Sequence, residues 1–176
     1  RGYRVNDRTN EFRRSSYYLT CDRVNGVLTV YTDSTMRIPI KTIRVSVGKA
    51  GTETPTGTWT MHRAGRWQEL MGPSWGQYGT HVVNGIFVHS VACGQANSYN
   101  LPVGEYLRLG NPASHGCIRA CVADAKWVWD NCNGSKIHIF DGTYTSNEAL
   151  KGPLGRKALT PLRGSKNFDP TDPACK

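Results

Sequence analysis

The sequence predicts a mainly β protein with one principal α-helix. Short runs rich in β-branched and aromatic residues begin at Val27 and recur as far as Phe140. The pair Asn84-Gly85 lies between two such runs and is typical of a β-hairpin turn. Only residues 122–131 follow a convincing helical repeat. The 176 residues are enough for one domain with one substantial core.

Composition and charge exclude several classes of protein. The sequence is 38% hydrophobic and 20% charged, which indicates a folded globular chain. No apolar run approaches the length of a membrane span, and residues 1–6 do not resemble a signal peptide. A leader or anchor of an exported form would therefore lie outside this sequence. The net charge of +9 suggests an anionic partner, but no nucleic-acid-binding motif accompanies it.

The first half of the chain predicts a lead-in followed by strands. Residues 1–26 are polar and are expected to pack on the edge of the domain with at most one early strand. Strands are predicted at residues 27–32 and 36–47, with a bend or bulge near Ile43, where the alternation changes phase. Pro39 lacks a backbone N–H and therefore places the second run at a sheet edge.

A loop, a strand and a second, longer loop come next. Residues 48–57 read as a loop because of their glycines and proline, and residues 58–63 as a strand. The glycine-rich residues 64–79 predict a long loop covering a cleft. The indoles of Trp67 and Trp75 would either grip a ligand or anchor this loop.

Residues 80–111 predict a hairpin and an irregular insertion. Asn84-Gly85 favours a type I′ turn, in which both residues have positive φ, and His89 then lies at the far end of the second arm. The insertion at residues 93–111 is expected to border the functional site. An ion pair between Glu105 and Arg108 could order this insertion.

The last third predicts a helix, a strand and a tail. The helix at 122–131 is expected to end before Gly134, and a final strand follows at 136–140. Residues 143–176 are rich in proline and glycine and predict an extended tail lying along the domain.

Six cysteines are many for a chain of this size. Their spacing fits neither a Cys-x-x-Cys motif nor a zinc site. We therefore expect an exported protein with one or two disulfides, the alternative being several buried free thiols. The pairing among Cys21, Cys93, Cys121, Cys132 and Cys175 stays open if Cys117 is reactive.

The strongest chemical signal is Ser114-His115-Gly116-Cys117-Ile118-Arg119. A free cysteine has a pKa of about 8.5, so its thiol needs an imidazole to become nucleophilic near neutral pH. A glycine directly before the cysteine permits close approach of a substrate. Two histidines compete as the base, His115 in the same segment and His89 from a separate strand. The alternative is a loop with a buried cysteine and a solvated histidine.

This hexapeptide resembles the active-site signature of the L,D-transpeptidases, the YkuD-type cell-wall enzymes. Residues 87–90 (Phe-Val-His-Ser) resemble the upstream histidine strand of that family, and residues 54–59 resemble its Thr-Pro-x-Gly turn. The three segments occur in family order, although residues 90–113 make the gap before Ser114 longer than is usual. The resemblance implies a β-sandwich of mixed sheets, with a catalytic domain at 27–142 between the lead-in and the tail.

The resemblance also implies roles for individual residues. Cys117 would be the nucleophile, His89 the base, and Ser90 would orient His89 through its backbone carbonyl. The backbone N–H groups of His115, Gly116 and Cys117 would form the oxyanion hole, next to Ser114. Arg119 would support the loop or bind a substrate carboxylate, unless it forms a structural ion pair. No metal or organic cofactor is implied.

The reaction implied by the resemblance is a two-step acyl transfer on peptidoglycan stem peptides. Cys117 would cleave the L-to-D peptide bond of a tetrapeptide stem, release D-alanine, and pass the acyl group to an amine of another stem. Carbapenem β-lactams would acylate the same thiol. The expected setting is the bacterial cell wall, outside the cell, where anionic wall polymers or solubility alone account for the charge. The protein is expected to be a monomer that binds no nucleic acid.

Two other functions fit the same residues. A cysteine carboxypeptidase or endopeptidase would use the pair of Cys117 and His89 with water as the acceptor. A non-catalytic wall-binding module would hold peptidoglycan with its aromatic side chains and positive charge.

Overall fold

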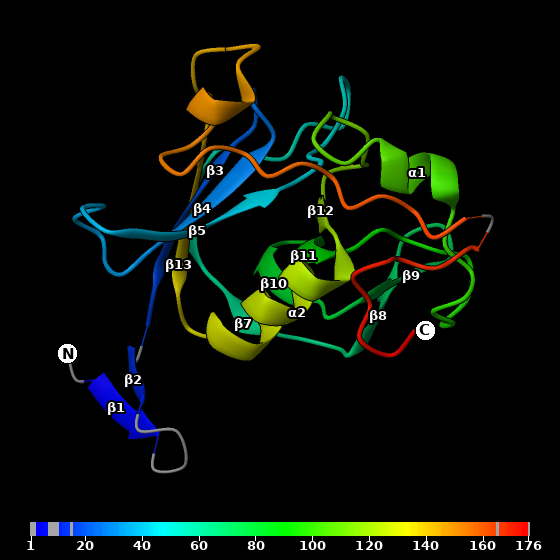
Figure 1. The fold of residues 1–176 in the computed structure, drawn as a ribbon, viewed down its shortest axis with the longest axis horizontal. Coiled ribbons are helices and arrows are strands. Elements are labelled where there is room, and N and C mark those ends of the chain that lie inside the picture. Colours follow the sequence, from blue (N-terminus) through cyan, green and yellow to red (C-terminus); the bar gives the residue numbers. More distant parts are fainter. Residues whose placement is uncertain (1–2, 7–10, 15, 165, 176) are drawn as a thin grey trace.

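Two mixed β-sheets packed against each other form the body of the protein (Figure 1). The computed structural model describes residues 3–6, 11–14, 16–164 and 166–175. The first sheet has five strands in the order β5-β4-β3-β13-β6, and only its β3–β13 pair is parallel. Its strands are β3 (Tyr18–Asp22), β4 (Val27–Tyr31), β5 (Pro39–Arg44), β6 (Gly57–Thr60) and β13 (Lys136–Phe140).

The second sheet carries the residues of the expected site. Its four strands have the order β12-β11-β10-β7, with β11 and β12 parallel. They are β7 (His62–Arg63), β10 (Thr80–Val83), β11 (Ile86–Ser90) and β12 (Ile118–Ala120). The remaining elements are the hairpin strands β8 (Trp67–Leu70) and β9 (Ser74–Gln77), the pair β1 (Tyr3–Asn6) and β2 (Glu11–Arg14), the helices α1 (Val103–Leu107) and α2 (Val122–Asn131), and a 3₁₀ helix (Glu148–Leu150).

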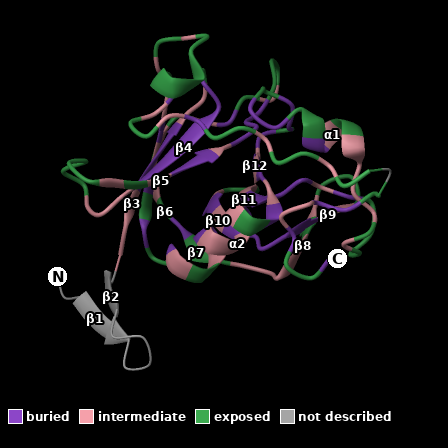
Figure 2. Ribbon diagram, in the orientation of Figure 1, coloured by how far each residue is buried: buried purple, intermediate pink, exposed green. Residues whose placement is uncertain are grey.

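The hydrophobic core lies between the two sheets and α2. Alternation along β13 turns Ile137 and Ile139 inward, and both are fully buried. They belong to one cluster with Val88 of β11, Ile118 of β12 and Val128 of α2. Full burial of one such side chain contributes about 1.5–3 kcal/mol. The buried positions in Figure 2 accordingly follow the strands, whereas the connecting loops are largely exposed.

The mainly β fold with one principal helix is confirmed. α2 spans Val122–Asn131 and β13 spans Lys136–Phe140, as the periodicity predicts. β5 lies at a sheet edge, as Pro39 requires. The pairing of β5 with β4 changes register between Pro39 and Lys41 of β5, opposite Val30 and Tyr31 of β4. The expected position near Ile43 is therefore wrong.

Three local expectations differ from the structure. The predicted lead-in contains three strands, β1, β2 and β3. β3 is the central strand of the five-stranded sheet, because β13, far along the chain, pairs with the side of β3 opposite its neighbour β4. Residues 64–79 form the β8–β9 hairpin and not an irregular loop. The β10–β11 turn is not type I′, because positive φ is found at Asn84 but not at Gly85.

The expected disulfides are also absent, since all six cysteines, which lie within the described residues, are free. Cys21 and Cys132 are fully buried in the hydrophobic core, where cysteine packs as a small apolar side chain. Cys121 hydrogen-bonds Asp124 Oδ2 at 3.2 Å, and Cys93 donates to the Gln95 carbonyl at 3.0 Å. These thiols therefore have packing or polar partners other than one another.

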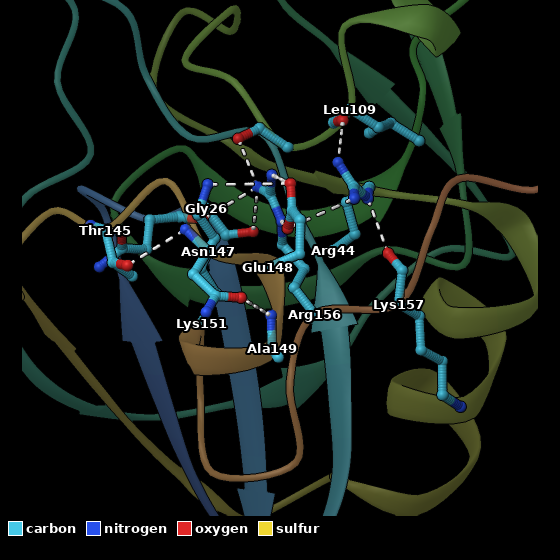
Figure 3. A network of polar contacts seen from close by, with 12 residues as sticks. Gly26, Arg44, Leu109, Thr145, Asn147, Glu148, Ala149, Lys151, Arg156 and Lys157 are labelled. Carbon is cyan, nitrogen blue, oxygen red and sulfur yellow. Dashed lines mark hydrogen bonds and ion pairs between the residues drawn. The ribbon is translucent and has the colours of Figure 1, made fainter.

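The C-terminal tail packs along the domain, anchored by a network around Arg156 (Figure 3). The Arg156 guanidinium, 4% exposed, forms two hydrogen bonds of 2.7 Å to the carboxylate of Glu148. It also donates to the carbonyls of Asn25 at 2.9 Å and Gly110 at 2.7 Å. One side chain thus joins the tail to two loops that are distant in sequence.

Replacing Arg156 with methionine is expected to lower the free energy of unfolding by about 2–4 kcal/mol, because buried carbonyls lose their donor. Urea denaturation at pH 7 measures the change. Lys126→Met is the matched control, since Lys126 is 39% exposed and pairs with Asp130 on the surface of α2. Its loss should stay below about 1 kcal/mol. Equal losses in the two variants would show that the Arg156 network does not anchor the tail.

Candidate active site

The cysteine loop, residues 114–117, leads directly into β12 beside β11. Gly116 has a φ of +128°, which residues with a side chain rarely adopt. A Cβ atom at Gly116 would lie 2.8 Å from Ile86 Cδ1. The glycine before Cys117 is therefore favoured by the backbone conformation, whereas the Ile86 side chain would only have to shift to make room for a Cβ atom.

Ser114 holds the loop in shape from within. It is 1% exposed, and its hydroxyl donates to the carbonyl of Cys117 and accepts the N–H of Gly116 at 3.0 Å. The N–H of Gly116, which the sequence resemblance implies would serve an oxyanion hole, is therefore engaged by Ser114 in this structure. The backbone N–H groups of His115 and Cys117 are the remaining candidates for that role.

A second anchor of the loop is Thr54, which the sequence places in the Thr-Pro-x-Gly turn but not among the site residues. Thr54 is fully buried, and its hydroxyl donates to the carbonyl of Gly116 at 2.6 Å. The same oxygen accepts the N–H of Gly48 at 2.9 Å. The turn therefore fixes the cysteine loop from the side of the five-stranded sheet.

The thiol of Cys117 is partly buried and points toward the start of β11. Its S–H donates to the carbonyl of Gly85 at 3.6 Å, and its sulfur accepts the N–H of Phe87 at 3.4 Å. Burial raises the pKa of this thiol, while the N–H of Phe87 and the charge of Arg119 lower it. Because burial dominates, the resting group is the neutral thiol.

His89 is 1% exposed near the end of β11. Its Nδ1 donates to the backbone carbonyl of Ser90, which can only accept, so Nε2 carries the free lone pair. Burial lowers the pKa of His89 to about 4, against the opposing effect of the Ser90 carbonyl. At neutral pH the imidazole is therefore uncharged and able to accept a proton.

Cys117 and His89 line one cleft of about 530 Å³. The parallel pairing of β11 with β12 sets His89 opposite Arg119, two residues after the thiol. Within the described residues no hydrogen bond joins the thiol to the imidazole, because the thiol is turned toward Gly85. The tip of the β8–β9 hairpin, including Leu70, borders the same cleft. Trp67 and Trp75 of that hairpin are half-buried and are not among the residues that line it.

Arg119 forms an ion pair with Glu105 of α1, with Nη1 and Oε2 2.9 Å apart. The sequence suggests Arg108 as the partner of Glu105, which is wrong, because parallel pairing with β11 carries Arg119 toward the insertion. Arg119 Nε is buried and has no hydrogen-bond partner among the described residues. His115 is exposed, and like Arg119 it lines the cleft.

The low pKa of His89 makes the stability of the protein depend on pH. An unfolded histidine has its ordinary pKa of 6.5, while that of folded His89 is about 4. Between these values the unfolded chain binds a proton that the folded chain excludes. Above pH 6.5 the titration of His89 therefore costs the folded protein no stability. As the pH falls from 6.5 toward 4, it lowers the free energy of unfolding by about 3 kcal/mol in all.

Urea denaturation at pH 7 and pH 4 measures this effect. Carboxylates also lose stabilising charge over this range, so wild type is compared with His89→Gln, which lacks the titrating group. The wild type should lose more free energy of unfolding between the two pH values than the variant. Equal losses would contradict a buried, neutral imidazole.

Known proteins resemble this chain in sequence. Residues 16–148 match the model of the YkuD family, the L,D-transpeptidase catalytic domain. The chain belongs to the L,D-transpeptidase family. A short match, 59% identical over 27 residues, links this L,D-transpeptidase domain to YciB of Bacillus subtilis (strain 168), a candidate L,D-transpeptidase by its name. That match covers 15% of this chain and 14% of YciB.

Solved structures share the fold of this L,D-transpeptidase domain. One is an L,D-transpeptidase from Mycobacterium smegmatis, with a TM-score of 0.53, 21% identity and coverage of 71% of this chain and 58% of that one. Another is the L,D-transpeptidase LdtMt1 in complex with imipenem, with a TM-score of 0.55, 20% identity and coverage of 73% and 61%. This chain thus spans about three fifths of each. At these identities the likeness establishes the fold alone.

Among the described residues, no cluster of three or more histidine, cysteine or acidic side chains could hold a metal ion. No helix in the described ranges is long and apolar enough to span a membrane.

Proposed function

We propose that this domain catalyses acyl transfer on peptidoglycan stem peptides, with Cys117 as nucleophile and His89 as general base. One observation carries the proposal: the thiol and the imidazole line the same cleft, and the Ser90 carbonyl fixes the imidazole so that Nε2 is the acceptor. A nucleophile, a base and a group that orients the base form the arrangement required for covalent catalysis.

The first step starts from two neutral groups. The thiol leaves the Gly85 carbonyl and gives its proton to His89 Nε2 as the sulfur attacks the carbonyl carbon of the L-to-D peptide bond. The oxyanion accepts hydrogen bonds from the N–H groups of His115 and Cys117. The C–N bond then breaks, His89 returns the proton to the leaving amine, and D-alanine departs from the Cys117 thioester.

The second step regenerates the enzyme. The side-chain amine of another stem attacks the thioester carbonyl, and the C–S bond breaks. His89 takes a proton from the attacking amine and returns it to the sulfur, so no other reactant is needed. Arg119 supports the cysteine loop through Glu105, which occupies its Nη1, so the other N–H groups of the guanidinium would meet a substrate carboxylate.

The proposed substrate implies where in the cell the protein acts. We propose that the protein acts outside the cell at the bacterial wall, as a monomer, on an anionic polymer that suits its net charge of +9. LdtMt1 has been solved with imipenem. We propose that carbapenems acylate Cys117 of this protein.

Incubation with a purified tetrapeptide stem, followed by mass spectrometry, tests the proposal. Cross-linked dimer together with free D-alanine is the expected result. Shortened monomer without dimer would instead indicate a cysteine carboxypeptidase or endopeptidase that uses water as the acceptor. Binding without any turnover would indicate a non-catalytic wall-binding module.

A further inference from the structure

Strand β9 lies directly against the imidazole of His89. A Cβ atom built on Gly76 of β9 would lie 2.6 Å from His89 Nδ1 and 2.8 Å from Cγ. The absence of a side chain at Gly76 therefore lets the backbone of β9 pack closely against the Nδ1 side of the imidazole. The position of β9 thus decides how the imidazole can tilt.

The next residue, Gln77, ties β9 to the end of β11. Its backbone N–H donates to Ser90 Oγ at 2.8 Å. Ser90 is the residue whose carbonyl accepts the Nδ1 hydrogen of His89. Gln77 is 5% exposed, so this bond is shielded from water. The peptide that orients the base is therefore held in place from β9.

The side chain of Gln77 is held in turn by two partners. Its Nε2 donates to Asp172 Oδ2 at 3.0 Å, and its Oε1 accepts from Arg66 Nη1 at 2.9 Å. Asp172 belongs to the C-terminal tail and is 3% exposed. A buried donor without a partner costs about 1–3 kcal/mol, so the link between Gln77 and Asp172 favours one placement of β9.

Asp172 is itself firmly placed. Its Oδ1 accepts the N–H of Ala174 at 2.9 Å. The neighbouring Asp169 accepts the N–H of Val122 at 2.8 Å, and Thr171 accepts that of Ala123 at 3.1 Å, which fixes this part of the tail at the N-terminus of α2. In Figure 1 the red end of the tail runs past α2, and Asp172 of this segment contacts Gln77 of β9.

We propose that Asp172 and Gln77 are positioning residues for the catalytic base, so that the C-terminal tail completes the active site without touching it. The chain of contacts runs from Asp172 to Gln77, from Gln77 to Ser90, and from Ser90 to His89. This inference rests on the proposed role of His89 as base. It extends that role by assigning the orientation of the imidazole to residues 77 and 172.

The link acts through geometry and not through charge. Arg119 of β12 is the charged side chain whose field acts on His89, and it opposes protonation. Asp172 reaches the imidazole only through Gln77 and Ser90. Loss of the link should therefore impair proton transfer from Cys117 by misaligning Nε2.

The pH dependence of Cys117 alkylation by iodoacetamide, resolved by peptide mass spectrometry, measures that transfer. Asp172→Asn replaces one of the two acceptor oxygens with an NH2 group, so that Gln77 Nε2 and the N–H of Ala174 can no longer both be accepted. At pH 7 it is expected to slow Cys117 alkylation about tenfold and to shift the profile toward alkaline pH, where the base is not needed. Gln77→Asn withdraws the amide by one methylene and should act in the same direction, which keeps the test valid if the first variant folds poorly.

Asp22→Asn is the matched control, because Asp22 also accepts a side-chain amide, Asn25 Nδ2 at 2.8 Å, and a backbone N–H, that of Val24 at 2.9 Å, but at the end of β3 in the five-stranded sheet. It should lower the melting temperature and leave the alkylation profile of Cys117 unchanged. Identical profiles for Asp172→Asn and Asp22→Asn would overturn the inference.

The role of His89 is tested in the same experiment with His89→Ala. If that variant alkylates as fast as wild type at pH 7, the proposed base is wrong and this inference fails with it. If His89→Ala is slow while Asp172→Asn and Gln77→Asn match wild type, only the inference fails.

Discussion

Replacing Cys117 with alanine is expected to lower the rate of stem-peptide dimer formation by about 10⁴-fold or more, to the limit of detection. The sulfur forms the acyl bond on which both steps depend, and no other nucleophile is proposed at this position. Mass spectrometry of dimer formed from a tetrapeptide stem measures the rate. Folding should be retained, because the Cys117 side chain is only partly buried.

Cys121→Ala provides the matched control for this variant. Cys121 is also partly buried and close in sequence, but it is not among the residues lining the cleft. Burial raises the pKa of its thiol to about 12, so Cys121 stays protonated at neutral pH. Activity should match that of wild type. Dimer formation by Cys117→Ala at the wild-type rate would show that Cys117 is not the nucleophile.

Replacing His89 with alanine is expected to slow the same reaction about 10²–10⁴-fold, because the neutral thiol then loses its proton acceptor. The loss should be greatest near neutral pH and smaller at alkaline pH, where the thiol ionises unaided. The rate of dimer formation between pH 6 and pH 10 tests this. A uniform loss across the whole range would indicate that His89 has a structural role only.

Ser90→Ala tests whether the backbone carbonyl of Ser90 or its side-chain hydroxyl orients His89. The carbonyl that holds Nδ1 remains in this variant, while the hydroxyl that accepts the N–H of Gln77 is lost. The rate should fall at most about tenfold, much less than in His89→Ala. Equal losses in the two variants would place the orienting function on the hydroxyl.

Much of the fold can be predicted from the sequence because its strongest signals are local. The helical repeat over 122–131 and the alternation over 136–140 reproduce α2 and β13 residue for residue. In each pattern the apolar positions indicate which side chains face the core. The hexapeptide at 114–119 likewise marks the cysteine loop, in which the residue before Cys117 has the positive φ that favours glycine.

The features that the sequence does not predict depend on partners far along the chain. β3 gains its central position from pairing with β13, more than a hundred residues later. Thr54 acts by hydrogen-bonding Gly116, and Gln77 acts by joining Ser90 to Asp172. Such residues leave no periodic trace, because their importance lies in single contacts that tertiary folding creates.

The resting state of the reactive pair also depends on tertiary structure. Sequence alone suggests that an imidazole assists the thiol, but burial decides the charge of each group. Because burial raises the pKa of Cys117 and lowers that of His89 to about 4, both groups are neutral in the free protein at neutral pH.

The central claim is that Cys117 forms a covalent acyl bond inside this cleft. Intact-mass analysis after incubation with imipenem, on wild type and on Cys117→Ala, tests it most directly. We predict that wild type gains the mass of one imipenem, mapped to Cys117, and that Cys117→Ala gains none. An unmodified wild type, or an adduct that persists in Cys117→Ala, would contradict the account.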